Sequence, residues 1–113
     1  MTVAYMTNRW DCRFEWFHSS LMRQSGGRFE KLVVVDYHAE RRAPEVRALA
    51  DVWCEPKPTV WQGRHRLTSK DYFAPSNARN TALCHAEGGY IVFVDDLSVL
   101  TPGWWSVVED EVL

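Results

Sequence analysis

Two apolar runs that each end in a carboxylate set the strongest limit on how this chain can fold. The sequence reads LVVVD at 32–36 and YIVFVDD at 90–96. The β-branched residues Val33, Val34 and Val35 leave no polar side for solvent, so the first run predicts a strand that is buried on both faces. Strands of this kind occur in parallel sheets that are covered by helices on both sides. We therefore expect an α/β fold.

The rest of the chain alternates between strand and helix patterns. A first strand is predicted at 2–6, and a helix over 9–24 with Asn8 as its N-cap and the glycines of 25–27 at its end. This alternation predicts a mainly parallel four-stranded sheet with flanking helices and a strand order of about 3-2-1-4. The remaining elements are expected as a strand at 29–37, a short helix at 43–50 with Pro44 at its first position, a strand at 51–55, a connection at 56–75, a helix at 75–89, a strand at 90–95 and a helix from about Pro102.

Composition is typical of a single globular domain, 1–113. The 113 residues, 46% hydrophobic and 25% charged, can form a small core. A net charge of −2 gives no general attraction to nucleic acid or to an anionic membrane, and the basic stretch 64–66 is read as a solvated loop. The four histidines lack zinc-site spacing. The three cysteines form no Cys-x-x-Cys pair, and no signal peptide or membrane-length apolar run is visible, so a cytoplasmic protein with reduced thiols is expected.

The carboxylates of Asp36, Asp95 and Asp96 stand at the ends of predicted strands. Ligands of open α/β sheets bind outside the carboxyl ends of the strands, so these side chains are expected at the rim of the sheet, where a ligand would lie. The sequence contains no G-x-G-x-x-G or Walker loop, so no glycine-rich cradle for phosphates is expected. Carboxylates are hard oxygen ligands that suit magnesium or manganese, and such a metal would neutralise a diphosphate leaving group.

Two other uses of acidic residues fit the sequence less well. An Asp-x-Asp phosphatase needs a second acid two residues after Asp95, where this chain has Leu97. Release of phosphate from simple phosphomonoesters by the protein would support the phosphatase alternative. A receiver-type magnesium pocket needs its acidic pair after the first strand, where the chain reads Met6-Thr7-Asn8. A site for a metal and a nucleotide diphosphate is the remaining interpretation.

Four short motifs follow one another along the chain. They are YMTNR (5–9), LVVVDY (32–37), SNARNTALCHAEGGYIVFVDD (76–96) and LTPGW (100–104). In this order they resemble the nucleotide-binding half of the GT-A glycosyltransferases, especially family 2, and the third stretch is the most specific. The resemblance covers nearly the whole chain. It implies a GT-A, Rossmann-like fold of the nucleotide-diphospho-sugar transferases.

The first two motifs imply the residues that would hold the nucleoside. By resemblance, Tyr5, Thr7 and Arg9 would line a pocket for the base and the ribose. Asp36 would accept a hydrogen bond from the base, as a carboxylate can from uracil N3–H.

The third motif implies the residues that would hold the diphosphate. Arg79 would face the nucleotide from the start of its helix, whose N-terminus also favours anions. Asp95 would contact the ribose, and Asp96 would bind the Mn²⁺ or Mg²⁺ that bridges the diphosphate. The usual family form is Asp-x-Asp, and Leu97 stands where its second Asp would be. Asp96 is therefore taken as the metal ligand in its place.

Several other residues keep more than one interpretation. Lys70 or Asp71, in the unusual stretch 68–76, could serve the nucleotide or belong to a surface loop. Trp61 is a candidate contact for a ligand or partner, whereas most of the other tryptophans are assigned to core packing. The acidic residues 109–111 are interpreted as a solvated helix face and not as a general base.

The expected function is transfer of a sugar from a nucleotide-diphosphate sugar, with UDP as the expected nucleotide, to an unnamed glycan, lipid or protein. The resemblance places the acceptor site and the general base in a second half that the 113 residues do not include, so no catalytic base is assigned. The alternative is a truncated, non-catalytic nucleotide-binding module, or a half-enzyme completed by a partner chain. A homo-oligomer or a partner chain could then cover the edge of the strand at 91–95.

Overall fold

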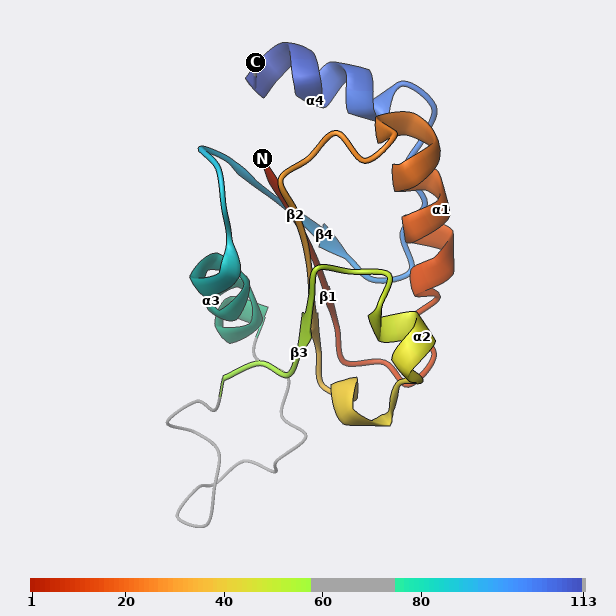
Figure 1. The fold of residues 1–113 in the computed structure, drawn as a ribbon, viewed down its shortest axis with the longest axis vertical. Coiled ribbons are helices and arrows are strands. Elements are labelled where there is room, and N and C mark those ends of the chain that lie inside the picture. Colours follow the sequence, from red (N-terminus) through yellow and green to blue (C-terminus); the bar gives the residue numbers. More distant parts are fainter. Residues whose placement is uncertain (58–74, 113) are drawn as a thin grey trace.

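Four parallel strands form the central layer of the computed structural model, which describes residues 1–57 and 75–112 (Figure 1). They are β1 (Thr2–Thr7), β2 (Lys31–Asp36), β3 (Val52–Cys54) and β4 (Ile91–Asp95). The strand order is β3-β2-β1-β4, and every pairing is parallel. The predicted α/β class, the parallel sheet and its strand order are therefore confirmed.

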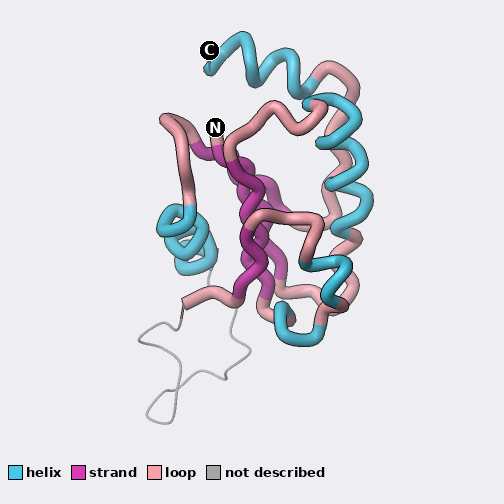
Figure 2. Tube along the Cα trace, viewed as in Figure 1, coloured by secondary structure: helices cyan, strands magenta, loops and turns pink. Residues whose placement is uncertain are grey.

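Helices cover both faces of this sheet (Figure 1, Figure 2). One face carries α3 (Pro75–His85), and the other carries α1 (Phe14–Ser25), α2 (Pro44–Arg47) and α4 (Trp104–Val112). A short 3-10 helix, η1 (Ala39–Arg41), follows β2. Because α1 follows β1 on one face and α3 precedes β4 on the other, the chain reverses its winding between β1 and β4. None of the helices within the described ranges is both long and apolar enough to span a membrane.

Alternate side chains of the central strands enter two separate cores. Val3 and Tyr5 of β1 pack with Phe17 on the α1 side of the sheet. Ala4 and Met6, which point the other way, pack on the α3 side. Successive side chains of a strand point to opposite faces, so burial of both faces requires apolar residues at every position. This two-sided burial explains the continuous apolar runs of β1 and β2.

The outer strand β4 is less buried than β1 and β2. Phe93 is 37% exposed, and Tyr90, which immediately precedes the strand, is 56% exposed. Ile91 packs on the α3-side core, and Val94 packs on the α1-side core. β4 is therefore an edge strand of the described sheet with partly exposed apolar side chains.

The first helix begins later than the sequence predicts. Its N-cap is Arg13, in the left-handed conformation with φ 55°, and not Asn8. Residues 9–13 form a loop, because contacts with the sheet compete with helix formation there. One of these contacts is the hydrogen bond that the buried Tyr5 hydroxyl donates to the Cys12 carbonyl over 2.7 Å.

The other ends of the helices agree with the sequence in part. Gly26 is the C-cap of α1, in the left-handed conformation with φ 59°, so the predicted glycine stop is confirmed. Pro44 lies in the first turn of α2, as predicted. Most tryptophans were predicted to pack in the core, but Trp10 lies in the 9–13 loop and is 61% exposed, so the prediction does not hold for this residue.

Candidate functional site

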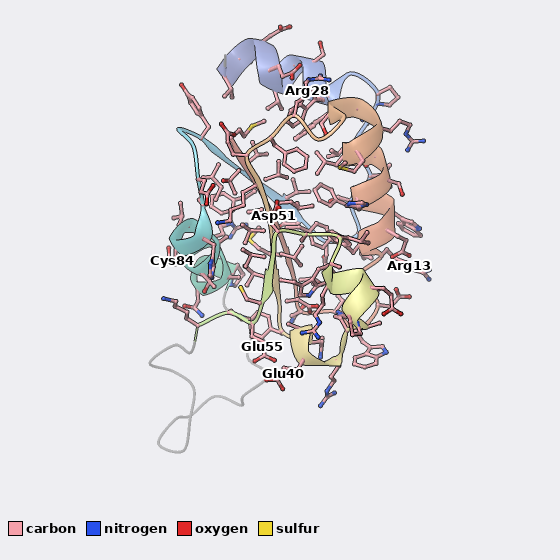
Figure 3. The ribbon with its side chains drawn as sticks, viewed as in Figure 1. Arg13, Arg28, Glu40, Asp51, Glu55 and Cys84 are labelled. Atoms are coloured by element: carbon pink, nitrogen blue, oxygen red, sulfur yellow. The ribbon has the colours of Figure 1, made fainter. Side chains whose placement is uncertain are left out.

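A pocket of about 300 Å³ opens at the carboxyl ends of β1 and β4. This is the point where the winding of the sheet reverses, which is the usual position of a ligand site in an open α/β sheet. Two other carboxylates, Glu40 and Glu55, lie at the same end of the molecule (Figure 3), but the pocket lining does not include them. The described residues that line the pocket are Met6, Thr7, Asn8, Arg9, Pro75, Arg79, Asp95 and Asp96.

The adjacent carboxylates Asp95 and Asp96 are bound by different elements. Asp95 is paired in register with Met6, whose side chain enters the α3-side core, and Asp95 Oδ1 lies 3.6 Å from Arg79 Nη2 on α3. Asp96 Oδ2 lies 3.1 Å from Arg9 Nε in the loop after β1. The two neighbours in sequence therefore meet two different guanidinium groups.

The two carboxylates also differ in how firmly they are held. The Asp95 side chain is 78% exposed, whereas that of Asp96 is 16% exposed. The Thr7 hydroxyl donates a hydrogen bond of 2.7 Å to Asp96 Oδ2 and accepts one of 3.1 Å from the Arg9 backbone N–H. Thr7 thus joins the end of β1 to the end of β4 and orients Asp96. The second oxygen of Asp96 makes no hydrogen bond to the part of the chain that the structure describes.

Asp36 lies at the end of β2, as predicted, but it is not an exposed rim carboxylate. Its side chain is fully buried and accepts four hydrogen bonds. Arg42 donates from Nε to Oδ2 over 2.7 Å and from Nη2 to Oδ1 over 3.2 Å. Trp53 Nε1 donates to Oδ2 over 3.0 Å, and the His38 N–H donates to Oδ1 over 2.9 Å. A nucleobase would have to displace one of these donors to bind Asp36.

The sequence interpretation missed the role of Arg42. Its Nη2 also donates to the Arg9 carbonyl over 2.7 Å, and its Nη1 donates to the Trp10 carbonyl. Burial disfavours the charge of Arg42, but the hydrogen bonds and negative charge of Asp36 outweigh this effect and raise the pKa of the guanidinium. Arg42 therefore fixes the loop that carries Arg9 to the end of β2. The one local signal in the sequence is the basic pair Arg41-Arg42 shortly after the carboxylate.

Tyr5 was predicted to line the base pocket, but its side chain lies in the core. It is fully buried, stacks on Phe17 with a ring-centroid distance of 4.8 Å and meets the edge of Phe14 at 5.2 Å. Burial raises the pKa of the Tyr5 hydroxyl well above its usual value. The Tyr5 side chain is therefore part of the α1-side core, and the pocket lining does not include it.

The donor set of the pocket can be compared with what a divalent metal needs. Across residues 1–57 and 75–112, no group of three or more His, Cys, Asp or Glu side chains is arranged to hold a metal ion. Magnesium, however, is usually held by one or two carboxylates together with substrate phosphates. Asp95 and Asp96 therefore fit a metal that enters with a diphosphate, and Leu97, with an apolar side chain 45% exposed, adds no ligand.

The other predicted contacts cannot be placed. Lys70, Asp71, Trp61 and the basic stretch 64–66 lie outside the described residues.

The acidic residues of α4 lie far from the pocket in the fold (Figure 1), and Glu109 forms an ion pair with Arg28, whose Nε lies 3.1 Å from Glu109 Oε1. The interpretation of this segment as a solvated helix face is compatible with that ion pair.

The structure thus brings Thr7, Arg9, Arg79, Asp95 and Asp96 to one pocket, whereas Tyr5 and Asp36 are buried and do not line it. No protein-family model, no curated protein and no solved structure matches this chain.

Proposed function

We propose that this chain binds a nucleotide-diphosphate sugar, with UDP as the nucleotide, and that it is the nucleotide-binding half of a GT-A glycosyltransferase of the family 2 type. The observation that carries this proposal is the pocket between β1 and β4, where the sheet reverses its winding. The first motif of the family resemblance supplies Arg9 to this pocket. The third motif supplies Arg79, Asp95 and Asp96.

The charges of the pocket support a ligand that combines a diphosphate with a metal. The two guanidinium groups of Arg9 and Arg79 balance the two carboxylates of Asp95 and Asp96. A nucleotide-diphosphate sugar carries two negative charges on its diphosphate, and one Mg²⁺ or Mn²⁺ balances them. Guanidinium groups are well suited to phosphate oxygens, and carboxylates to the metal. Each charged group of the pocket would therefore find an opposite charge on the ligand.

In this proposal the residues of the pocket orient the donor for sugar transfer. The metal, when bound, would stabilise the charge that develops on the diphosphate as the glycosidic bond breaks. Arg9 and Arg79 would hold the phosphates, and the N-terminus of α3 would add a favourable field. Thr7 would keep Asp96 oriented toward the metal through its 2.7 Å hydrogen bond. An acceptor hydroxyl would attack the anomeric carbon after a general base removes its proton.

A second candidate is a nucleotide-binding module without turnover, or a half-enzyme that a partner chain completes. Two observations favour it. β4 is an edge strand of the described sheet and its Phe93 is 37% exposed, and an uncovered edge strand can pair with a strand of another chain. Asp95 and Asp96, the carboxylates of the pocket, are both paired with arginines, so neither is assigned as the base.

The test is calorimetric titration of UDP, GDP and UDP-sugars, with and without Mn²⁺. We expect UDP to bind in the presence of Mn²⁺, and this binding to be lost in Asp96→Ala. Glu40→Ala is the matched control, because Glu40 lies at the same end of the fold without lining the pocket. Failure of every nucleotide to bind with Mn²⁺ would refute the proposal. Binding without release of sugar to any acceptor would favour the second candidate.

A further inference from the structure

We propose that Arg9 and Arg79 are exchangeable counter-ions of the pocket, so that a divalent metal and a diphosphate bind together and neither binds well alone. In the free protein each arginine neutralises one carboxylate. When the metal and the diphosphate enter, each arginine transfers to a phosphate oxygen and each carboxylate turns to the metal. This inference rests on the proposed function, because it concerns the same pocket.

The first argument is the pairing in the free pocket. Arg9 Nε lies 3.1 Å from Asp96 Oδ2, and Arg79 Nη2 lies 3.6 Å from Asp95 Oδ1. A metal ion that arrived alone would have to enter beside two guanidinium cations and compete with them for the carboxylates. A diphosphate that arrived alone would have to enter beside two carboxylates. Like charges at such short distances repel, so the binding of either ion alone is disfavoured.

The second argument is that the exchange leaves every charge paired. Two cations and two anions of the protein meet two positive charges of the metal and two negative charges of the diphosphate of a nucleotide sugar. The pairs between guanidinium and carboxylate become pairs between guanidinium and phosphate and between carboxylate and metal. Guanidinium binds phosphate through charge-assisted hydrogen bonds of comparable strength. The combined ligand therefore avoids the unpaired charge that each ion alone would create.

The third argument is that the arginines can move while Asp96 stays in place. The Arg9 side chain is 56% exposed and that of Arg79 is 42% exposed, and ion pairs at such exposure are weak and easily separated. Asp96 keeps its hydrogen bond of 2.7 Å from the buried Thr7 hydroxyl when Arg9 leaves. Asp96 is thus a fixed ligand with a removable counter-ion. Asp95, which is more exposed, is held less firmly.

The test compares three ligands on the same protein: MnCl₂ alone, inorganic pyrophosphate alone, and the two together. Free Mn²⁺ is followed by electron paramagnetic resonance and binding heats by calorimetry, each against a blank of Mn²⁺ and pyrophosphate without protein, because these two ions also form a complex in solution. We expect the affinity for the combination to exceed that for either ion alone by at least about tenfold, which is about 1.4 kcal/mol of coupling. Equal affinity for Mn²⁺ with and without pyrophosphate would overturn the proposal.

The variants Arg9→Gln and Arg79→Gln give a sharper result, because the two ligands should respond in opposite directions. Removal of a guanidinium frees its carboxylate, so Mn²⁺ alone should bind more tightly. Removal of the same group takes away a phosphate ligand, so Mn²⁺ with pyrophosphate should bind more weakly. Arg47→Gln, an exposed arginine of α2 outside the pocket lining, should change neither affinity. Changes of the same sign for both ligands in the pocket variants would overturn the exchange.

The outcome also separates this inference from the proposed function. If Mn²⁺ and pyrophosphate bind together as described but UDP binds no better than pyrophosphate, the exchange stands and the nucleotide function fails. If UDP binds with Mn²⁺ but the arginine variants change the affinities for Mn²⁺ alone and for Mn²⁺ with pyrophosphate in the same direction, the proposed function stands and the exchange is refuted. Melting curves followed by circular dichroism would show that each variant is folded.

Discussion

Replacement of Arg42 by alanine should destabilise the protein more than loss of an ordinary surface arginine. The Asp36 side chain is completely buried, and the Arg42 side chain is 14% exposed. The variant would leave the Asp36 carboxylate with two of its four donors, Trp53 Nε1 and the His38 N–H. Removal of one partner of a buried ion pair typically costs about 3–5 kcal/mol, because the remaining charge stays buried without compensation.

This loss is large for a chain of this size. Single domains are stable by only about 5–15 kcal/mol. Urea denaturation followed by circular dichroism would measure it: with a slope of about 1–3 kcal/mol per molar urea, a loss of about 4 kcal/mol lowers the midpoint by more than about 1 M. Arg41→Ala is the control, since Arg41 is the exposed neighbour and also approaches the Trp10 ring. We expect Arg41→Ala to stay within about 0.5 kcal/mol of wild type.

A second substitution tests the physical reason for the loss. If the cost comes from an uncompensated carboxylate, Asp36→Asn in the Arg42→Ala background should recover part of the stability, because the unpaired charge is removed. Equal stability of Arg42→Ala and Arg41→Ala would refute the reasoning. So would a double variant that loses the full sum of the two single losses.

Three further predictions concern the pocket, its support and the thiols. Thr7→Val should cost about 1–3 kcal/mol in urea denaturation, because it leaves buried polar groups without their hydroxyl partner, and should weaken nucleotide binding with Mn²⁺; Thr7→Ser should restore both. Tyr5→Phe should lower the free energy of unfolding by about 0.5–1.5 kcal/mol but leave the affinity for the nucleotide unchanged. A loss of affinity would instead indicate that the Tyr5 hydroxyl contacts the nucleotide. Burial raises the pKa of the Cys12 thiol, so a thiol reagent near neutral pH should label the exposed Cys84 before Cys12. The labelling of Cys12 should become faster as the pH rises or as the protein unfolds. Rapid labelling of Cys12 in the folded Cys84→Ser variant would contradict this prediction.

The sheet could be predicted from the sequence because its signal is local. Burial on both faces requires apolar residues throughout β1 and β2, and a carboxylate at the end of a strand marks the carboxyl edge. The alternation of strands and helices then restricts the topology to very few arrangements. The position of the pocket between β1 and β4 follows from that order, and the strand-end position of Asp95 and Asp96 predicts that they lie there. Thr7, Arg9 and Arg79 were predicted from the resemblance to the GT-A family and not from the order of the strands.

The environment of Asp36 could not be predicted in this way. Its partners are Arg42, which follows the strand after a turn, and Trp53, which comes from a neighbouring strand. A pattern of residue types places the carboxylate at the strand end but does not show which distant donors reach it. The start of α1 could not be predicted for the same reason. Asn8 is a local capping signal, but residues 9–13 make contacts with the sheet, and the helix begins after them.

The most direct test of the central claim is an NMR titration of the ¹⁵N-labelled protein with UDP and Mg²⁺, which leaves the signals unbroadened by a paramagnetic ion. The account predicts that the largest amide shifts fall on Thr7, Arg9, Arg79 and Asp96, with little change at the opposite end of the sheet. A second hollow there, of about 290 Å³, is lined by residues such as Trp105. Shifts centred on that hollow, or no shifts at millimolar UDP, would contradict the account.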